Sequence, residues 1–403
     1  MKKIAGGVCA AKGFLASGIH CGIRKNKTKK DLALIYSEKR ASAAAVYTTN
    51  LVKGAPLTVT RENISDGFAQ AVICNSGNAN TCNANGIEIA TQMCALLGEE
   101  LHISGKDVVV ASTGVIGQPL DIAPIQKGIP ALVAGLGKNS EAACEGIMTT
   151  DTKLKEIAYE FKAGGKLCRI GGIAKGSGMI HPNMATMLVF VTTDCAIAPA
   201  LLRAALCEDV KTSFNMVSVD GDTSTNDTVL LLANGAAGND ELTEENEDYQ
   251  TFLDALLYVN TCLAKKIAGD GEGATALFEV KVVGAESKEQ AVTLSKSIIT
   301  SNLTKAAIFG HDANWGRILC AMGYSGAQFD PEKVDLYFES KAGKLQIIKD
   351  GVATDYSEEE ATKILSEKEV TAIADVKMGE ATATAWGCDL TYDYVKINAD
   401  YRS

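Results

Sequence analysis

A glycine-rich segment that carries one cation and ends at a threonine is the part of this chain best suited to chemistry. It runs from Lys175 to Thr186 as Lys-Gly-Ser-Gly-Met-Ile-His-Pro-Asn-Met-Ala-Thr, and an apolar run follows. If the chain cuts itself between Ala185 and Thr186, the new α-amino group, with an ordinary pKa near ~8, can act as the base for the neighbouring hydroxyl. The segment therefore suits self-cleavage followed by acyl transfer through Thr186.

The same segment also has a plainer interpretation. Threonine is common in strands, and Thr186 opens the strand-like run Thr-Met-Leu-Val-Phe-Val-Thr. On spacing alone, an ordinary strand residue is favoured over a self-cleaving one. Two features remain compatible with cleavage. Ala185 is small enough to leave its carbonyl accessible, and a β-branched threonine has few χ1 rotamers, so its hydroxyl can be aimed.

A histidine-based nucleophile is not indicated. The chain has four histidines, and it contains no G-x-S-x-G elbow. His181 is the nearest histidine to the glycine-rich segment, but Pro182 restricts its backbone, which favours a structural role. A terminal threonine needs no histidine, because its own amine can serve as the base.

Composition excludes several other classes of function. The 403 residues are 46% apolar and carry a formal net charge of −10, which argues against binding of nucleic acid or an anionic membrane. No apolar stretch approaches the ~20 residues of a membrane span. The twelve cysteines include no C-x-x-C pair, which favours reduced thiols in a cytoplasmic protein over disulfides or zinc ligands. We expect no metal and no cofactor.

The elements that position these residues alternate between strands and helices, which predicts an α/β fold. Several strands follow one another without room for a crossover helix, so the sheets should be mixed or antiparallel. Strands are expected at 42–47, 70–74, 107–111, 156–161, 186–192, 227–233, 278–283, 306–309 and 370–376. Helices are expected at 86–100, 198–214, 248–268 and 287–300. The last stretch, 381–399, alternates like a strand with one exposed face.

A shift in composition suggests two domains. After about Val283 the chain becomes more charged. We therefore predict a main α/β domain over 1–283 and a smaller C-terminal α/β domain over 284–403.

The segment from Lys175 to Thr186 closely resembles the self-cleavage motif of the ornithine acetyltransferase family of arginine biosynthesis, also called glutamate N-acetyltransferase (ArgJ). Other blocks similar to that family follow in order over essentially the whole chain. They are Thr-Thr-Asn-Leu-Val-Lys at 48–53, Asn-Ser-Gly-Asn-Ala-Asn at 75–80, Ser-Thr-Gly-Val-Ile-Gly at 112–117, Thr-Thr-Asp-Thr at 149–152, Ser-Val-Asp-Gly-Asp-Thr-Ser-Thr-Asn-Asp at 218–227, Gly-Glu-Gly-Ala-Thr at 271–275, Gly-His-Asp-Ala-Asn-Trp-Gly-Arg at 310–317 and Asn-Ala-Asp-Tyr-Arg-Ser at 398–403.

The resemblance implies a fold and an assembly. The fold is a layered αββα sandwich that resembles N-terminal nucleophile hydrolases but differs in connectivity, with a smaller C-terminal α/β domain that contributes the chain's tail to the site. Autoproteolysis between Ala185 and Thr186 would give an α segment, 1–185, and a β segment, 186–403. Family members resemble α2β2 heterotetramers, so the expected partners are the two segments of the same precursor.

The resemblance also implies a reaction. N2-acetylornithine would give its acetyl group to Thr186 and leave as ornithine, and glutamate would then take the acetyl group to become N-acetylglutamate. No cofactor is needed for this ping-pong transfer. Some family members also accept acetyl-CoA as donor and are bifunctional, and no residue of the sequence separates the two kinds. A self-processed amidase or aminopeptidase, with water as second acceptor, stays open as the alternative.

The family's site residues correspond to a small set here. The oxyanion hole falls on Thr113 and Gly114, and Thr186 is the nucleophile. The substrate-binding positions are Thr152, Lys175, Thr186, Glu272, Asn398 and Ser403. Lys175 suits a substrate carboxylate, and Glu272 suits an ammonium group. Ser403 stands where relatives often have threonine, so a hydroxyl is retained there.

Overall fold

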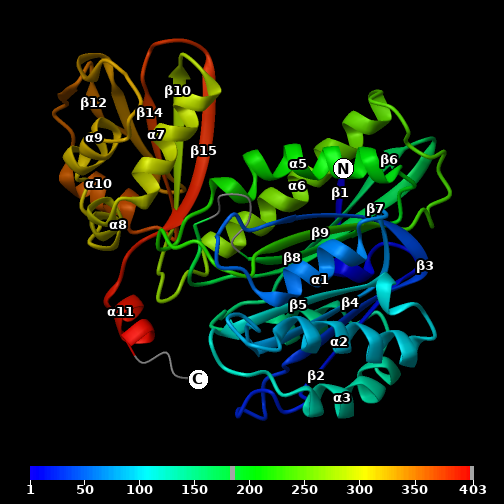
Figure 1. The fold of residues 1–403 in the computed structure, drawn as a ribbon. Helices are drawn as coiled ribbons and strands as arrows, with labels where there is room; N and C mark the ends of the chain where they lie inside the picture. The colour runs from blue at the N-terminus through cyan, green and yellow to red at the C-terminus, as the bar shows by residue number, and fades with distance from the viewer. Residues whose placement is uncertain (182–186, 400–403) are drawn as a thin grey trace.

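The computed structural model describes residues 1–181 and 187–399, and it contains two β-sheets flanked by helices (Figure 1). The larger sheet has nine strands in the order β1-β6-β7-β8-β9-β3-β4-β5, with β2 paired to β3 beside this path. Its strands are β1 (Lys2–Ile4), β2 (Phe14–Ile19), β3 (Leu32–Tyr47), β4 (Phe68–Asn78), β5 (Val108–Val115), β6 (Lys155–Ala163), β7 (Lys166–Lys175), β8 (Leu188–Thr193) and β9 (Thr228–Ala233).

The large sheet folds into two facing layers. Along each strand, alternate residues point to opposite faces and so pack in different buried clusters. Val72 of β4 and Phe190 of β8 belong to one buried cluster, which lies between the layers. Their neighbours point outward: Ile73 packs in the cluster under α2 and α3, and Val189 packs in the cluster under α5 and α6. The predicted αββα sandwich is therefore confirmed, and Figure 1 shows the two outer helical layers on opposite sides of the strands.

Helices and short turns connect the strands of this main body. The helices are α1 (Ala55–Asn63), α2 (Gly86–Leu101), α3 (Ile122–Ala134), α4 (Ser140–Ile147), α5 (Pro199–Thr212) and α6 (Glu247–Ala268), and 3₁₀ turns lie at Gly7–Cys9, Gly105–Asp107 and Phe214–Met216. Over residues 1–181 and 187–399, none of the helices combines the length and the apolar character that crossing a bilayer requires. The twelve cysteines all lie in these ranges as free thiols.

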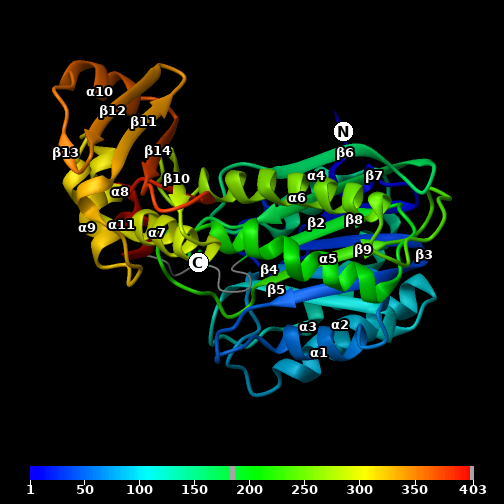
Figure 2. The same ribbon diagram turned by 90° about the horizontal axis from the view of Figure 1, so that it is seen from above.

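The second sheet has six strands in the order β13-β12-β11-β14-β10-β15. Figure 2 shows it with its helices beside one end of the layered body, and its buried side chains continue the cluster under α6. The predicted boundary at Val283 falls inside its strand β10. The elements of this part are β10 (Leu277–Ala285), α7 (Lys288–Thr300), α8 (Asn302–Phe309), α9 (Trp315–Gly323), a 3₁₀ turn (Pro331–Lys333), β11 (Asp335–Ser340), β12 (Gly343–Lys349), β13 (Val352–Ala353), α10 (Glu358–Leu365), β14 (Glu369–Asp375), β15 (Ala381–Cys388) and α11 (Tyr392–Ala399).

The predicted mixture of parallel and antiparallel pairs is confirmed, since β4–β5, β8–β9 and β10–β14 are parallel and their other neighbours are antiparallel. All four predicted helices exist, within a few residues at their ends.

The strand predicted at 306–309 is wrong, because these residues end helix α8. The Ser301 hydroxyl caps this helix by accepting a hydrogen bond from the Thr304 N–H at 3.3 Å. An apolar run of only four residues fits a buried strand and a buried helix equally well, so periodicity could not separate the two.

The strand predicted over 381–399 is only half right. Strand β15 ends at Cys388, and the chain then turns into helix α11. The Asp389 carboxylate accepts the Thr275 N–H at 2.8 Å, and the Thr391 hydroxyl donates to the Gly273 carbonyl at 2.7 Å. These bonds fix the turn against the Gly-Glu-Gly loop, and α11 follows below the second sheet in the view of Figure 1.

Candidate active site

The glycine-rich segment leaves one strand of the large sheet and returns in its neighbour. Lys175 is the last residue of β7, and it lies opposite Leu188, the first residue of β8, in an antiparallel register. Leu188 in turn lies opposite Thr228 of β9, and the Met187 carbonyl accepts the Thr228 N–H at 2.8 Å. Lys175 and Met187, the described residues on either side of the cleavage position, are therefore fixed at one edge of the sheet. Ala185, Thr186 and Ser403 lie outside the described residues.

A small cavity of about 120 Å³, called here the inner cavity, lies at this edge. Five of the residues implied by the family resemblance line it: Thr113, Gly114, Lys175, Glu272 and Asn398. They come from four distant parts of the chain, namely the end of β5, the end of β7, the loop between α6 and β10, and helix α11. The fold thus brings them together around one space.

Gly114 forms part of the cavity wall in a conformation that excludes a side chain. Its φ is +132°, and a Cβ there would lie 2.3 Å from the Gly77 carbonyl carbon and 2.5 Å from the Asn78 nitrogen. Only glycine fits where β4 and β5 approach so closely. No side chain therefore separates the backbone at Gly114 from the cavity.

Lys175 connects the two sheet layers across the cavity. Its side chain is largely buried, and Nζ donates a hydrogen bond to the Thr113 hydroxyl oxygen at 3.3 Å. Because that oxygen accepts from Lys175, the hydroxyl hydrogen of Thr113 stays available to another acceptor. A cation and an oriented hydroxyl donor therefore share one wall.

Three buried ions, called here the charged floor, hold the loops beneath the cavity. Lys155 Nζ lies 2.7 Å from an Asp151 oxygen and 2.5 Å from an Asp270 oxygen, and all three side chains are almost fully buried. Burial opposes ionisation of Asp151, but the charges of Lys155 and Lys175 outweigh it and lower its pKa to about 2. The ionised Asp151 also accepts the Gly176 N–H at 2.7 Å, at the start of the glycine-rich segment.

Thr152 belongs to this floor rather than to the cavity wall. Its hydroxyl donates to one oxygen of Asp270, and its N–H donates to the other at 3.1 Å. Among the predicted site residues that the structure describes, it is the one that does not line the inner cavity. It ties the loop before β6 to the loop that carries Glu272.

Glu272 is held against the glycine-rich segment. Its N–H donates to the Ser177 carbonyl at 2.9 Å, and its side chain accepts from Asn398 Nδ2 at 2.7 Å. A Cβ at Gly178 would lie 2.3 Å from a Glu272 oxygen, so glycine is needed there for the carboxylate to approach. Lys175 and Glu272 therefore give one cavity a positive and a negative wall, which suits an amino acid with both charges.

Several lining residues were not predicted from the sequence. Asn226 donates from Nδ2 to the carbonyls of Ala79 and Ser112, at 2.6 and 2.9 Å, and so joins the loop before β9 to the ends of β4 and β5. Thr149 and Thr150 also line the inner cavity. All lie in or beside blocks that resemble the family, but small polar residues of this kind are equally typical of turns.

Asp227 and His181 lie near the cavity without lining it. Asp227 is fully buried, one of its carboxyl oxygens has no partner among the described residues, and burial raises its pKa well above the ordinary value against the opposing charge of Lys175. His181 lies with Nδ1 3.1 Å from the Ser218 hydroxyl, and burial lowers its pKa.

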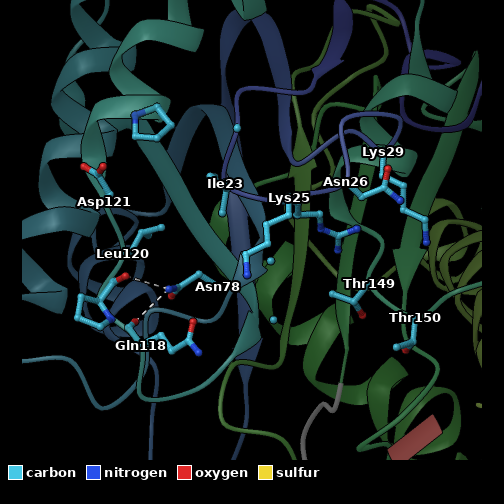
Figure 3. Close-up of a pocket in the computed structure, with 16 residues that line it drawn as sticks. Ile23, Lys25, Asn26, Lys29, Asn78, Gln118, Leu120, Asp121, Thr149 and Thr150 are labelled. Carbon is cyan, nitrogen blue, oxygen red and sulfur yellow. Dashed lines mark hydrogen bonds between the residues drawn. The ribbon is translucent and has the colours of Figure 1, made fainter. Parts of the chain in front are cut away.

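A larger space, called here the outer cleft, opens beside the inner cavity. Its volume is about 710 Å³, and it shares Gly114, Thr149 and Thr150 with the inner cavity (Figure 3). The two spaces are therefore neighbours with a common wall, one small and one large.

Comparisons with known proteins show the family to which the chain belongs. Residues 15–403 match the sequence model of the ArgJ family. The chain is 53% identical to the arginine biosynthesis bifunctional protein ArgJ of Symbiobacterium thermophilum and 50% identical to that of Caldanaerobacter subterraneus, in both cases over all of each chain. A crystal structure of ArgJ from Bacillus halodurans aligns with a TM-score of 0.50 and 46% identity, covering 53% of this chain and 97% of that one. This chain therefore belongs to the ArgJ family.

Proposed function

We propose that this protein transfers an acetyl group from N2-acetylornithine to glutamate through an ester on Thr186, after cleaving itself between Ala185 and Thr186. As a member of the ArgJ family it is an acyltransferase of arginine biosynthesis. The observation that carries the finer proposal is the pair of opposite charges, Lys175 and Glu272, on the walls of one cavity beside an oriented Thr113 hydroxyl.

The proposed cleavage step uses the threonine as both nucleophile and new terminus. The Thr186 hydroxyl oxygen attacks the Ala185 carbonyl carbon, its proton goes to the departing amide nitrogen, and an ester forms. Water then hydrolyses the ester, which leaves a carboxylate on Ala185 and a free α-amine on Thr186. The Thr228 contact to Met187, the next residue in the chain, supports a defined position for this new terminus.

The transfer has two half-reactions of the same kind. In the first, the α-amine of Thr186 takes the hydroxyl proton, and the oxygen attacks the acetyl carbonyl of acetylornithine. The Thr113 hydroxyl and the Gly114 backbone would stabilise the oxyanion, and the proton passes to the ornithine nitrogen as it leaves. In the second, the glutamate amine attacks the ester, and Thr186 is restored. Lys175 would bind the α-carboxylate common to both substrates, and Glu272 an ammonium group.

The strand order supports a two-chain form that stays together after cleavage. Strands β8 and β9 come from the β segment, and they lie between β7 and β3, which come from the α segment. Cutting the chain between β7 and β8 breaks no pairing of the sheet. The Bacillus halodurans chain aligns over nearly its whole length with 53% of this chain, and residues 186–403 likewise make up just over half. An α2β2 assembly in the cytoplasm completes the proposal, with acetyl-CoA as a second acetyl donor.

The decisive experiment compares Thr186→Ala with Thr186→Ser. Wild type and Thr186→Ser should yield two fragments, one beginning at position 186, and both should carry acetyl label there after incubation with labelled acetylornithine. Thr186→Ala should remain a single 42.3 kDa chain with no label and no transfer. Two fragments from Thr186→Ala would contradict the proposal. Release of free acetate faster than transfer to glutamate would favour the amidase alternative.

Lys175 can be tested by Lys175→Met, with Lys166→Met at the exposed start of the same strand as control. A charge-assisted hydrogen bond contributes about 1.5–3 kcal/mol, so kcat/KM for acetylornithine should fall about 10- to 100-fold. Lys166→Met should behave as wild type. Unchanged kinetics in Lys175→Met would remove Lys175 from the substrate site.

A further inference from the structure

Two cysteines face each other near the end of the large sheet away from the inner cavity. Strands β7 and β8 pair in an antiparallel register. The same register continues past the end of β8, because the Asp194 N–H donates to the Arg169 carbonyl at 3.2 Å. The residue before Arg169 is Cys168, and the residue after Asp194 is Cys195. The register therefore places Cys168 directly opposite Cys195.

The backbone geometry of this pair suits a disulfide. The Cys195 N–H donates to the Thr193 hydroxyl at 3.2 Å and not across to Cys168, so the two cysteines form a non-hydrogen-bonded pair. The Cα atoms of such an antiparallel pair lie about 4.5 Å apart. Disulfides in proteins span Cα separations of about 4.4–6.8 Å. The backbone thus already holds Cys168 and Cys195 within the range that a disulfide requires.

Both thiols extend to the same face of the sheet. Cys168 and Cys195 belong to the buried cluster beneath α5 and α6. Asn239 lies beside both, because Cys168 Sγ is 3.9 Å from Asn239 Oδ1 and that oxygen accepts the N–H of Ala196, next to Cys195, at 2.7 Å. A hydrogen bond from the Cys195 thiol lowers the pKa of Cys168, whereas hydrogen bonding with Cys168 and burial raise the pKa of Cys195. Cys168 is therefore the better nucleophile of the two.

The pair lies just beneath the surface. Leu167, immediately before Cys168, is 47% exposed, and the hairpin turn between β6 and β7 lies at Gly164 and Gly165. Cys168 and Cys195 themselves are fully buried. Strand ends and turns open locally at a small cost in free energy. A molecule as small as hydrogen peroxide can therefore reach these thiols, whereas a protein oxidant is kept away from them.

The two cysteines lie on opposite sides of the proposed cleavage position. Cys168 belongs to the α segment and Cys195 to the β segment. Lys175, which lines the inner cavity, is seven residues from Cys168 along β7, about 23 Å in an extended strand. A bond between Cys168 and Cys195 would therefore join the two segments without altering the inner cavity.

We propose that Cys168 and Cys195 are a peroxide-sensitive pair that forms a reversible disulfide between the α and β segments. As a link between two chains, the inference rests on the proposed cleavage before Thr186. In the first step the Cys168 sulfur attacks an oxygen of hydrogen peroxide, the oxygen–oxygen bond breaks, and a sulfenic acid and one water form. In the second, the Cys195 sulfur attacks the sulfenic sulfur, the sulfur–oxygen bond breaks, and the hydroxide leaves with the thiol proton as a second water. Two thiols are oxidised and one peroxide is reduced, and small thiols reverse the link by exchange.

The link would change how the cleaved protein recovers from unfolding. Two separate segments must meet again by diffusion before they refold, so their recovery depends on protein concentration. A disulfide keeps both segments in one molecule, where the effective concentration of one near the other does not change on dilution. The pair would therefore protect the two-chain form under oxidising conditions.

The test treats purified wild type, Cys168→Ala, Cys195→Ala and Cys94→Ala with hydrogen peroxide and then alkylates the remaining thiols. Cys94, a buried cysteine of α2, serves as the control. On a denaturing gel without reductant, wild type and Cys94→Ala should show the two segments joined near 42.3 kDa, and reductant should separate them. Cys168→Ala and Cys195→Ala should show separate segments with and without reductant, because the remaining cysteine of the pair has no partner thiol.

Peptide mapping of oxidised wild type gives a readout that needs no variant to fold. Residues 168 and 195 should appear in one disulfide-linked pair of peptides, whether or not the chain is cleaved. An uncleaved chain with this linked pair would support the disulfide while contradicting the proposed cleavage. Both cysteines recovered as thiols or as separate oxidised acids, a link to a different cysteine, joined segments in Cys168→Ala, or loss of the link in Cys94→Ala would each overturn the inference.

Discussion

The charged floor beneath the inner cavity and the contact between helices α5 and α6 both bury carboxyl groups. The pKa of the buried carboxyl group is lowered in the floor and raised between the helices. In the floor, Asp151 is 4% exposed and lies beside Lys155, and its pKa falls to about 2. Between the helices, Asp209 is 5% exposed, and among the described residues its carboxyl group accepts hydrogen bonds from neutral groups alone, those of Asn260 and Ser213. There burial dominates and raises the pKa of Asp209 to about 7.

The difference shows that a buried ammonium group keeps a neighbouring buried carboxyl group ionised. Removing a carboxylate from water is costly unless a cation and hydrogen bonds compensate, so an unpaired one takes up a proton instead. With Lys155 beside it, Asp151 stays ionised at physiological pH. The carboxyl groups of Asp151 and Asp270 accept hydrogen bonds from Gly176, Thr152 and Lys153, and hold the loops around the inner cavity in place.

The largest expected effect follows from removing the cation of the floor. Lys155→Met leaves Asp151 and Asp270 buried without their partner, and breaking one side of a buried ion pair typically costs about 3–5 kcal/mol of stability. Denaturant titration at pH 7 should show this loss in the free energy of unfolding. Lys153→Met, which changes an exposed lysine two residues away, should stay within about 0.5 kcal/mol of wild type.

Equal stability of these two lysine variants would mean that the floor is not held by its ions. The comparison with Asp209 would then lose its basis, because the pKa of Asp151 could not be attributed to Lys155.

A second effect should appear as a pH dependence at the helix contact. The pKa of Asp209 rises from an ordinary 3.8 to about 7 in the folded protein, so the folded state binds the proton more tightly. Its contribution to stability is complete below pH 3.8 and is lost as the pH rises through 7. Asp209→Asn keeps an uncharged group there, so it should gain stability over wild type between pH 4.5 and pH 8, on the order of 2–4 kcal/mol.

The free energies of unfolding of both proteins at several pH values measure this difference. Asp254→Asn, on the exposed side of α6, is the control and should show no such trend. A difference that does not change with pH would show that Asp209 is already ionised at pH 4.5, and that its neutral partners suffice.

Sequence patterns predicted the parts of the fold in which a hydrophobic pattern extends over many residues. The 22 residues of α6 have ten buried positions, all apolar except Asn260, and the run before Thr193 in β8 is buried throughout, so both could be anticipated. The four residues at the end of α8 could not, because a short apolar run has no distinguishing period. Chain ends such as 381–399 change from strand to helix through contacts with the distant loop at Gly273 and Thr275.

The candidate site likewise contains residues that sequence motifs could identify and residues that they could not. Lys175 and Glu272 could be named from motifs that resemble the family, and the fold brings them to one cavity. The floor could not be named, since Lys155 meets Asp270 from 115 positions away and looks in sequence like a solvated lysine. Asp209 follows Leu202, Ala205 and Leu206 at seven, four and three residues, so the spacing places it on the buried face of α5. What the spacing does not record is the partner that a buried charge meets, because that partner comes from a distant element.

The smallest effect is expected at Asp227, which lies near a lysine as Asp151 does but has a raised pKa as Asp209 does. It is fully buried and feels the charge of Lys175, but one of its oxygens has no partner among the described residues, and burial keeps its pKa well above the ordinary value. Because burial favours the protonated form of this carboxyl group, Asp227→Asn should mimic that form, with a change in unfolding free energy at pH 7 within about 1 kcal/mol. Asp222→Asn, exposed in the same loop, serves as control. A loss of several kcal/mol in Asp227→Asn would instead identify Asp227 as an ionised partner of Lys175, and would move it from the class of Asp209 to that of Asp151.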